Sequence, residues 1–449
     1  MFYRTIINEL RKWAAKPDRR PLVLRGARQV GKTTAVKMFA GEFDLFIYLN
    51  LEKAEERNIF EGEYPFNELL NRLFLYVGEE KNAGRTLIFI DEIQNSPKTM
   101  ALLRFFYEEA DDLYVIAAGS LLENIMDENI SFPVGRVEFM VMNPCTFKEF
   151  LGAMGEEQSL KLYGQEDTPS YAHDKLSALF KKYATIGGMP QVLESYSSKQ
   201  DYTALNSIYS SLITSYSEDV EKYARSASMT QYIRHIISTA FREAGSRITF
   251  EKFGNSPYRS REMKEAFTTL EKTMLLKLVY PVTSTKLPFS PDLKKKPRLH
   301  IFDTGLVNYS LGILGELIAE KYLDNVYRGR IAEHIVGQEL AGNSFSVMNT
   351  IEFWTREKKE SSAEVDYVVS HKGMLIPVEV KGGASGSLRS LHQFVDAAPH
   401  AWAVRFYSGK MAVENSRTIA GKNYKLINLP FYLAGKLDRI LNDNIGLVE

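Results

Sequence analysis

The residues of this chain with the most specific chemistry lie in one short segment near its start. The segment Gly26-Ala27-Arg28-Gln29-Val30-Gly31-Lys32-Thr33-Thr34 follows the apolar run Pro21 to Leu24. Its Gly-x-x-x-x-Gly-Lys-Thr spacing is that of a P-loop on a strand-to-helix turn, where backbone N–H groups face bound phosphates. The Lys32 amine would reach the terminal phosphates, and the Thr33 hydroxyl is placed to ligate a magnesium ion. The segment therefore predicts a binding site for ATP and Mg²⁺.

A second segment supplies the other half of such a site. Leu87-Ile88-Phe89-Ile90 is a short apolar strand that ends in Asp91-Glu92. Strand ends of a parallel sheet meet the phosphate loop at one sheet edge, so these carboxylates would face the nucleotide. Asp91 is predicted to hold magnesium, and the adjacent Glu92 suits activation of water. The pair favours ATP hydrolysis over the phosphoryl transfer of small-molecule kinases, for which the sequence offers no identifiable acceptor site.

A third set of residues, near the C-terminus, suits phosphodiester chemistry. Asp366 opens one predicted strand, and the Glu379-x-Lys381 spacing puts both of its side chains on one face of the next strand. Clustered carboxylates can hold magnesium against a scissile phosphate, and a lysine can stabilise or deprotonate the attacking water. Glu333 could add a carboxylate from the preceding helix. Gln393 could add a polar group from the following helix, although a solvent-exposed glutamine is the alternative.

Apolar strands alternate with helical patterns over the first 150 residues, as expected for an α/β parallel sheet with helices on both faces. Glycine-rich and polar stretches between residues 155 and 200 end this pattern. We therefore predict a P-loop domain at residues 1–155 and a helical lid or linker at residues 156–245. The five predicted strands are Leu22 to Arg25, Phe46 to Leu49, Leu87 to Ile90, Tyr114 to Ala118 and Val137 to Met142.

The next segment, residues 246–305, has the pattern of a winged helix. A helix over about Ser260 to Lys272 precedes strands at Leu275 to Val279 and Arg298 to Phe302, which are joined by a loop containing Lys294-Lys295-Lys296. In such domains the second helix enters a DNA groove and the strand-connecting loop forms a wing. The pattern predicts a compact unit with two surfaces that could contact nucleic acid.

The same segment is the most basic part of the chain. Residues 247–298 contain 12 basic and 5 acidic residues, a formal charge of +7 in a protein whose net charge is +0. Arg259, Arg261 and Lys264 start the second helix, where side chains meet phosphates and bases, and the three lysines would lie in the wing. We expect contacts with double-stranded DNA; a winged helix used only for packing is the alternative.

Beyond residue 325 the order of predicted elements is helix, three strands, helix and strand. This α-β-β-β-α-β order is that of restriction-endonuclease-like cores, and we predict such a domain at residues 325–440. A Glu-x-Lys triplet alone arises roughly once or twice by chance in such a chain, so its weight depends on this order. The elements are Arg328 to Leu340, Phe345 to Trp354, Glu364 to Val369, Met374 to Val380, Ser387 to Ala397 and Ala401 to Phe406.

The composition fits several domains in one chain. At 449 residues, 45% hydrophobic and 12% aromatic, the chain can fill about two to four cores. The single cysteine, Cys145, excludes an internal disulfide and suits a reducing compartment. Residues 1–15 lack the apolar core of a signal peptide, and no window approaches the ~18 uninterrupted apolar residues of a membrane span. We expect a cytoplasmic protein without membrane contact.

Eight short motifs are spread over nearly the whole chain: Gly26 to Thr34, Leu87 to Glu92, Ala118 to Ser120, Asn143 to Phe150, Gly187 to Pro190, Phe302 to Leu306, Glu364 to Asp366 and Glu379 to Lys381. With them the chain resembles a known group, the prokaryotic AAA-type P-loop ATPases that carry a C-terminal domain of unknown function with a restriction-endonuclease-like PD-(D/E)xK core. The resemblance implies a P-loop domain followed by a nuclease-like one, with ATP and Mg²⁺ as ligands.

The resemblance also implies roles for single residues. Glu92 would orient or deprotonate the attacking water, Asp91 would hold magnesium through water, and Ser120 would be the polar sensor after the fourth strand. Arg136 is similar to the arginine that reaches a phosphate in its own subunit or across an interface. A surface salt bridge is the alternative for Arg136, and action across an interface would require a homo-oligomer.

Three functions are compatible with these patterns. The first is an ATP-hydrolysing switch associated with DNA through its winged-helix and nuclease-like segments. The second is an ATP-regulated, magnesium-dependent DNA nuclease that uses Asp366, Glu379 and Lys381. The third is a module that binds DNA or protein through a decayed nuclease core without cutting.

Overall fold

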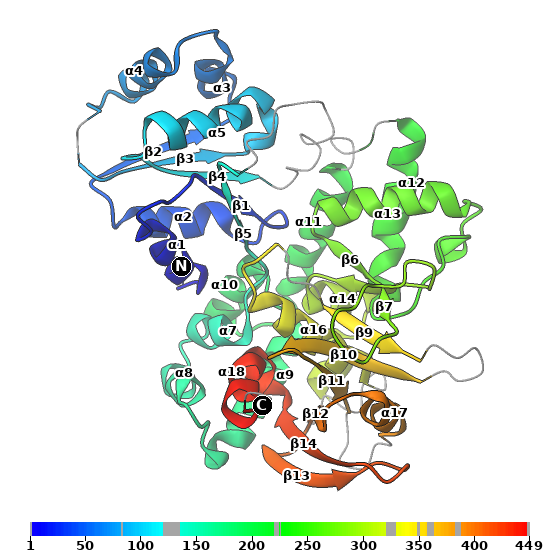
Figure 1. Cartoon of the computed structure of the whole chain (residues 1–449). Helices are drawn as coiled ribbons and strands as arrows, with labels where there is room; N and C mark the ends of the chain where they lie inside the picture. The colour runs from blue at the N-terminus through cyan, green and yellow to red at the C-terminus, as the bar shows by residue number, and fades with distance from the viewer. Residues whose placement is uncertain are drawn as a thin grey trace.

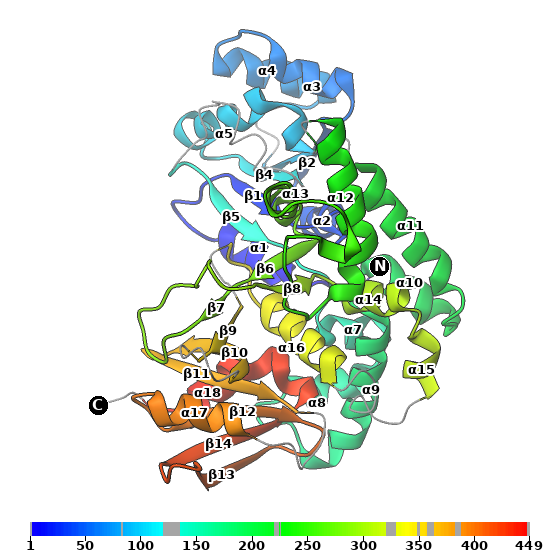
Figure 2. The same ribbon diagram turned by 90° about the vertical axis from the view of Figure 1, so that its right-hand side faces the viewer.

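The molecule contains two sheet-based units at its opposite ends, with helices between them (Figure 1). The view turned by 90° shows the same order, with the C-terminal sheet below α16 (Arg330–Gly342; Figure 2). The computed structural model describes residues 2–81, 84–119, 135–219, 224, 226–319, 329–347, 351–356, 363–381 and 388–446.

The N-terminal unit is a five-stranded sheet of order β2-β3-β4-β1-β5. All four pairings are parallel, and β1 lies between β4 and β5. The predicted parallel sheet is thus confirmed, and each strand lies within one residue of its predicted bounds. The strands are β1 (Leu22–Arg25), β2 (Leu45–Asn50), β3 (Thr86–Asp91), β4 (Tyr114–Gly119) and β5 (Glu138–Val141).

Helices cover both faces of this sheet. Successive strand residues point to opposite faces, so Leu22 and Leu24 of β1 pack with α1 and α2, whereas Val23 packs with α3, α4 and α5. Burial on both faces explains why these strands are apolar throughout rather than alternating. The helices are α1 (Ile6–Ala14), α2 (Lys32–Ala40), α3 (Ala54–Glu61), α4 (Phe66–Val77) and α5 (Pro97–Glu109).

Helices between residues 147 and 319 connect the two sheets and share a continuous apolar core with both. Within the described ranges, no helix is long and apolar enough to cross a membrane. The connecting helices are α7 (Phe147–Ala153), α8 (Glu157–Gly164), α9 (His173–Ile186), α10 (Pro190–Lys199), α11 (Leu205–Glu218), α12 (Ala227–Ala240), α13 (Ser260–Lys272), α14 (Thr304–Leu311) and α15 (Leu314–Ala319).

Two of the sequence motifs meet inside this helical region. The buried Asp303 carboxylate accepts hydrogen bonds from the N–H groups of Gly188 (2.6 Å) and Leu306 (3.0 Å). A Cβ on Gly188 would lie 2.2 Å from the carbonyl oxygen of Cys145, so only glycine fits there. The segments 187–190 and 302–306 therefore pack against each other, and these two motifs have a structural role.

The basic segment contains the predicted helix and strands. Helix α13 matches its predicted bounds, and it precedes the antiparallel pair β6 (Leu276–Val279) and β8 (Arg298–Ile301). Arg247 adds an isolated antiparallel bridge to Arg298. The small sheet and the helix pack together through apolar side chains of the main core.

The loop between β6 and β8 differs from the free wing that we expected. Within it, β7 (Pro281–Val282) pairs in parallel with β9 (Glu352–Thr355) of the C-terminal sheet. The Trp354 Nε1–H donates to the carbonyl oxygen of Thr283 at 3.1 Å, and Lys295 Nζ donates to Thr355 Oγ1 at 3.2 Å. The loop that carries the three lysines is thus anchored along the edge of the C-terminal sheet.

The C-terminal sheet has seven strands in the order β13-β14-β12-β11-β10-β9-β7. One face packs against α17 and the other against α16 and the C-terminal helical segment. The predicted order α-β-β-β-α-β is present, followed by two strands and a helix that were not predicted. The remaining elements are β10 (Glu364–His371), β11 (Met374–Val380), α17 (Arg389–Ala397), β12 (Trp402–Tyr407), β13 (Ala412–Arg417), β14 (Asn423–Pro430) and α18 (Leu437–Asn444).

The strand predicted over Phe345 to Trp354 is wrong at its start, because β9 begins only at Glu352. The Phe345 carbonyl instead accepts a hydrogen bond from the Val141 N–H of β5 at 2.9 Å. Asn143 Nδ2 reinforces this contact by donating to the carbonyl oxygen of Ala341 at 3.1 Å. The segment after α16 therefore joins the two units rather than extending the C-terminal sheet.

Candidate functional site

The loop between β1 and α2 has the backbone that a P-loop needs. Gly31 has φ = 94° and Gln29 has φ = 64°, in the left-handed region. A Cβ on Gly26 would lie 2.4 Å from the Met142 carbonyl oxygen, so a larger residue would displace the chain that follows β5. The loop is consequently shaped by close backbone approach, as the glycine spacing predicted.

Lys32 is buried at the first turn of α2, with its amine turned into the loop. Its Nζ donates to the carbonyl oxygens of Gly26 (2.9 Å) and Ala27 (3.0 Å). Burial lowers the pKa of Lys32 to about 8, against the opposing effect of Glu92 and Asp91, and the nearby Arg28 charge lowers it further. An anionic ligand in the loop would raise this pKa again, because it would stabilise the charged amine.

The Thr33 hydroxyl and the Asp91 carboxylate lie side by side at the carboxyl edge of the sheet. Thr33 Oγ1 donates to Asp91 Oδ2 at 2.7 Å, and the Tyr48 hydroxyl is 3.4 Å from the same oxygen. Burial raises the pKa of Asp91, and the Glu92 charge adds to this, while the Thr33 hydrogen bond lowers it. Hydroxyl and carboxylate oxygens are the ligands that Mg²⁺ prefers.

Glu92 is held in an uncommon backbone conformation beside Asp91. Its φ is 54°, in the left-handed region, and its N–H donates to Asp91 Oδ1 at 3.1 Å. Gln94 donates through its side-chain amide to the Glu92 carboxylate. Such strain in a residue that is not glycine is common where a side chain must point in a functional direction. The structure thus brings Lys32, Thr33, Asp91 and Glu92 together.

The other predicted residues of this site lie elsewhere or outside the description. Ser120 follows β4 but is outside the described residues. Arg136 precedes β5, whose first residue Glu138 pairs with Leu22 at the start of β1, so it lies at the opposite edge of the sheet from the P-loop. Its Nε donates to Glu108 Oε1 at 2.7 Å on the surface. Contact with a phosphate of its own subunit is therefore disfavoured, and action across an interface stays a prediction.

One buried residue that supports the P-loop was not predicted. Arg4 donates to the carbonyl oxygens of Val30 (2.7 Å) and Asn143 (2.8 Å) and forms an ion pair with Glu149 at 3.1 Å. It thereby ties the chain before α1 to the loop and to α7. The only sequence signal for Arg4 is a charged residue next to an amphipathic helix, which is too common to identify a role.

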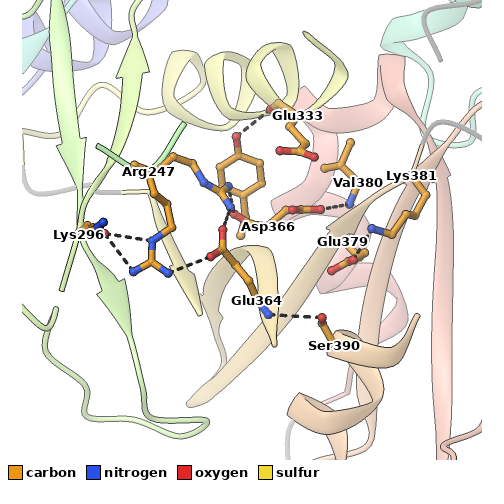
Figure 3. Close-up of polar contacts among 11 residues, drawn as sticks. Arg247, Lys296, Glu333, Glu364, Asp366, Glu379, Val380, Lys381 and Ser390 are labelled. Atoms are coloured by element: carbon orange, nitrogen blue, oxygen red, sulfur yellow. Dashed lines mark hydrogen bonds and ion pairs between the residues drawn. The ribbon is translucent and has the colours of Figure 1, made fainter. Parts of the chain in front are cut away.

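A second polar cluster lies on β10 and β11 below α16, as Figure 3 shows. The register that pairs Tyr367 with Val378 places Asp366 opposite Glu379 one residue further on. Asp366 Oδ2 accepts the Val380 N–H at 2.8 Å. Lys381 forms an ion pair with Glu379 at 2.6 Å.

Burial changes the proton affinity of these carboxylates. It raises the pKa of Glu379 to about 8 and that of Glu333 to about 7, with the Asp366 charge as the second cause for both. The pKa of Asp366 is raised in the same way, although Arg298 and Lys381 oppose the rise. Glu379 Oε2 is buried and has no hydrogen-bond partner among the described residues. Three carboxylates and two cations therefore share one largely buried site.

Two arginines that sequence reasoning missed complete this cluster. Arg298 of β8 is 7% exposed, pairs with Glu364 and donates to the Asp366 carbonyl oxygen at 3.0 Å. Arg247 pairs with the other Glu364 oxygen at 3.3 Å and donates to the Lys296 carbonyl oxygen (Figure 3). The basic segment thus supplies two guanidinium groups to the acidic strand.

The cluster does not form a three-ligand metal site. Over the described ranges, no three histidine, cysteine, aspartate or glutamate side chains are grouped closely enough to hold a metal ion. Gln393 of α17 is partly buried, and its side-chain oxygen accepts a hydrogen bond from Arg356 at 3.0 Å. The donor types of the nuclease prediction are present, and their placement is that of an ion-pair network.

Three comparisons with known proteins bear on these sites. Residues 18–151 match the family model of an AAA domain. Residues 177–316 and 328–432 match two models described only as domains of unknown function, DUF8612 and DUF4143. No curated protein matches the chain. Residues 18–151 form an AAA-type P-loop domain.

Solved structures similar to the chain include one described as a Walker-type ATPase. A Walker-type ATPase of Pyrococcus abyssi is 14% identical, with coverage of 69% of this chain and 96% of that one and a TM-score of 0.44. Aeropyrum pernix Orc1 in complex with DNA is 16% identical, with 70% and 93% coverage and a TM-score of 0.28. C. elegans PCH-2 is 10% identical, with 44% and 64% coverage and a TM-score of 0.29. At these values the assignment of the AAA domain depends on the family model and the P-loop geometry.

The predicted DNA contacts lie outside the AAA domain and fall into two groups. Arg259, Arg261 and Lys264 are exposed at the start of α13. Lys294 and Lys296 are also exposed, but they belong to the loop that β7 anchors, and Lys295 is partly buried against Thr355. The lysine loop is therefore anchored rather than a free wing, whereas the start of α13 presents its basic side chains to solvent.

Proposed function

We propose that the chain is an Mg²⁺-dependent ATP hydrolase that works as a nucleotide-controlled switch and associates with DNA through its middle and C-terminal segments. The observation that carries the hydrolase is the convergence of Lys32, Thr33, Asp91 and Glu92 at one sheet edge, with 2.7 Å between Thr33 Oγ1 and Asp91 Oδ2. An AAA domain at residues 18–151 supports the same reaction.

Each residue has a part that follows from its position. Lys32 would exchange its two carbonyl partners for phosphate oxygens, and the loop N–H groups would hold the remaining phosphate charge. Thr33 and Asp91 would hold magnesium, which when bound neutralises phosphate charge. Glu92 would orient the attacking water and accept its proton, since its carboxylate follows directly on the magnesium aspartate.

The proposed switch requires a structural connection between the nucleotide site and the basic segment. Helix α11 contacts α12, and α12 contacts α13, so a chain of packed helices leads from the AAA domain to Arg259, Arg261 and Lys264. A ligand that binds one arrangement of these helices better than another would change which arrangement is populated. DNA contact at α13 is the proposed output.

The test is phosphate release by the purified chain with Mg²⁺ and ATP, with and without double-stranded DNA. We expect release that Lys32→Ala abolishes and that DNA stimulates. Release that Lys32→Ala leaves unchanged would remove the hydrolase proposal. Release indifferent to DNA, together with no binding of labelled duplex at low salt, would remove DNA association and leave a protein partner for the switch.

A second candidate function is magnesium-dependent DNA cleavage at the β10–β11 cluster. The observation that favours it is Glu379 Oε2, a buried carboxylate oxygen without a hydrogen bond among the described residues, next to Lys381 and Asp366. Cleavage is the second candidate because Glu379 is already paired with Lys381, and Arg298 is paired with Glu364 beside Asp366. Incubation of plasmid with the wild type and with Asp366→Ala separates the candidates, because only a nuclease would cut with the first and not with the second.

A further inference from the structure

An ion pair connects the phosphate loop to a helix outside the AAA domain. Arg28, between the two P-loop glycines, pairs through its guanidinium with the Asp219 carboxylate. Asp219 directly follows the last residue of α11, Glu218, and is the C-terminal cap of that helix. Tyr216 of the same helix donates from its hydroxyl to the Arg28 carbonyl oxygen at 3.4 Å. Both the side chain and the backbone of Arg28 therefore contact the end of α11.

The Arg28 charge is close enough to affect the phosphate-binding lysine. It contributes to the lowered pKa of Lys32, whose amine marks the position of the terminal phosphates. A triphosphate bound there would carry several negative charges within the same range of Arg28. The nucleotide and Asp219 would therefore both attract one guanidinium group.

The surroundings make Arg28 the adjustable part of this loop. Lys32 donates to the carbonyl oxygens of Gly26 and Ala27 at the start of the loop, and Arg4 donates to that of Val30. The side chain of Arg28 is 34% exposed, whereas that of Asp219 is only 10% exposed. The guanidinium is therefore the more solvent-accessible partner of this pair, and the carboxylate is the more buried one.

From these contacts we infer that Asp219 is a positioning residue for the nucleotide site. It holds Arg28 while the loop is empty, and bound ATP competes for the same guanidinium and loosens the end of α11. Asp219 thereby lowers ATP affinity. It also couples ATP binding to the end of α11, and so to the helices that lead to α13. The inference rests on the proposed ATP hydrolase, whose regulation it names.

The experiment compares Asp219→Asn with Glu218→Gln. Glu218 is the neighbouring, exposed residue of α11, so this control variant removes the same charge without removing the Arg28 pair. We expect Asp219→Asn to lower the Kd and KM for ATP about two- to fivefold, the size of one partly exposed ion pair, with little change in kcat. Hydrogen exchange of α11 amides should rise when a slowly hydrolysed ATP analogue binds the wild type and Glu218→Gln. In Asp219→Asn it should be high with or without the analogue.

Other outcomes overturn the inference. Unchanged or weaker ATP affinity in Asp219→Asn, or α11 exchange that still responds to the analogue, would contradict it. If Asp219→Asn fails to fold, Arg28→Gln gives the second test, with weaker ATP binding and an α11 that no longer responds. If the wild type itself does not bind the analogue, the proposed ATPase function is wrong, whatever the role of Asp219. Analogue binding that is equally weak in the wild type and in Lys32→Ala identifies this case.

Discussion

The two carboxylate sites of this molecule balance their charges in different ways. In the AAA domain, Lys32 is held by the neutral carbonyl oxygens of Gly26 and Ala27. In the C-terminal cluster, Lys381 is paired with Glu379, and Glu364 is paired with two arginines. The first cation can move to an incoming phosphate at the cost of two ordinary hydrogen bonds. The second is already neutralised by a carboxylate.

The difference shows why residue types alone do not identify a catalytic site. Both sites contain a lysine and acidic residues at strand ends, and both patterns are visible in the sequence. In a site that binds a charged ligand, the protein's own charged group needs partners that the ligand can replace. A buried ion pair does not meet this need, because separating it leaves a charge without a partner and away from water. By this measure the AAA site is prepared for a ligand, and the C-terminal cluster is largely complete without one.

The largest expected effect tests the first site. Glu92→Gln should keep ATP binding and lower turnover about 100-fold or more, because the amide cannot accept a proton from water. Fluorescent-nucleotide binding and phosphate release measure the two properties separately. Gln94→Glu is not a suitable control because it adds charge, so Gln94→Ala serves instead, and it should lower turnover far less. Equal turnover in Glu92→Gln and wild type would contradict the role of Glu92.

The second prediction sharpens the contrast at the C-terminal cluster. Arg298→Met should lower the free energy of unfolding by about 3 kcal/mol, because it removes the buried guanidinium that pairs with Glu364 and lies beside the buried Asp366. Arg247→Met removes the other partner of Glu364, which is more exposed, and should cost less than about 1 kcal/mol. Urea unfolding of both variants measures the difference. Equal destabilisation by the two variants would show that burial of Arg298 is not the source of its effect.

A third prediction concerns a buried carboxyl group, that of Glu339, whose charge is neutralised by a proton rather than by a cation. Glu339 of α16 is 1% exposed and accepts hydrogen bonds from the Phe147 N–H (2.8 Å) and the Tyr183 hydroxyl (2.9 Å). Burial raises its pKa from 4.5 to about 7. Between these values the unfolded chain has lost this proton while the folded chain keeps it, so the free energy of unfolding falls as pH rises.

The expected fall from this group is about 2 kcal/mol between pH 5 and pH 7. Glu339→Gln should remove that part of the pH dependence, since a neutral amide does not titrate. Unfolding by urea at several pH values checks the slope. A variant whose stability keeps the wild-type slope would show that Glu339 is ionised in the folded protein.

The smallest expected effect concerns DNA. Reversal of charge at Arg259, Arg261 or Lys264 should weaken duplex binding and reduce the salt dependence by about one unit of slope for each phosphate that the side chain no longer neutralises. Reversal at Lys295 should have less effect, since its amine is bound to Thr355. Fluorescence anisotropy at several salt concentrations measures both. A larger effect at Lys295 than at α13 would place the DNA on the anchored loop.

The sequence predicted the elements whose signals are local. The strands of the first sheet are short apolar runs between helical patterns, and Leu22 to Arg25 was predicted with its observed bounds. The P-loop and the Asp91-Glu92 pair are fixed by spacing, and the structure places them together. Helix α13 was also predicted with correct bounds, because Ser260 and Lys272 lie at clear ends of an amphipathic pattern.

The sequence did not predict contacts that join distant segments. Arg298 and Glu364 are 66 residues apart, and nothing near either residue indicates the other. Phe345 was assigned to a strand by its apolar neighbours, although its carbonyl bonds to Val141 of the other sheet. Strand β7 is only two residues long and begins with proline, so it has no periodicity to detect.

The short strand β7 also determines how the chain can be divided. The family matches end at residue 316 and resume at residue 328, which suggests a cut between them. A fragment that begins there would lack β7, and the outer edge of β9 would carry unpaired N–H and C=O groups. Unpaired strand edges recruit strands from other molecules. Such a fragment should therefore self-associate, whereas one that begins before residue 246 would keep its edge covered.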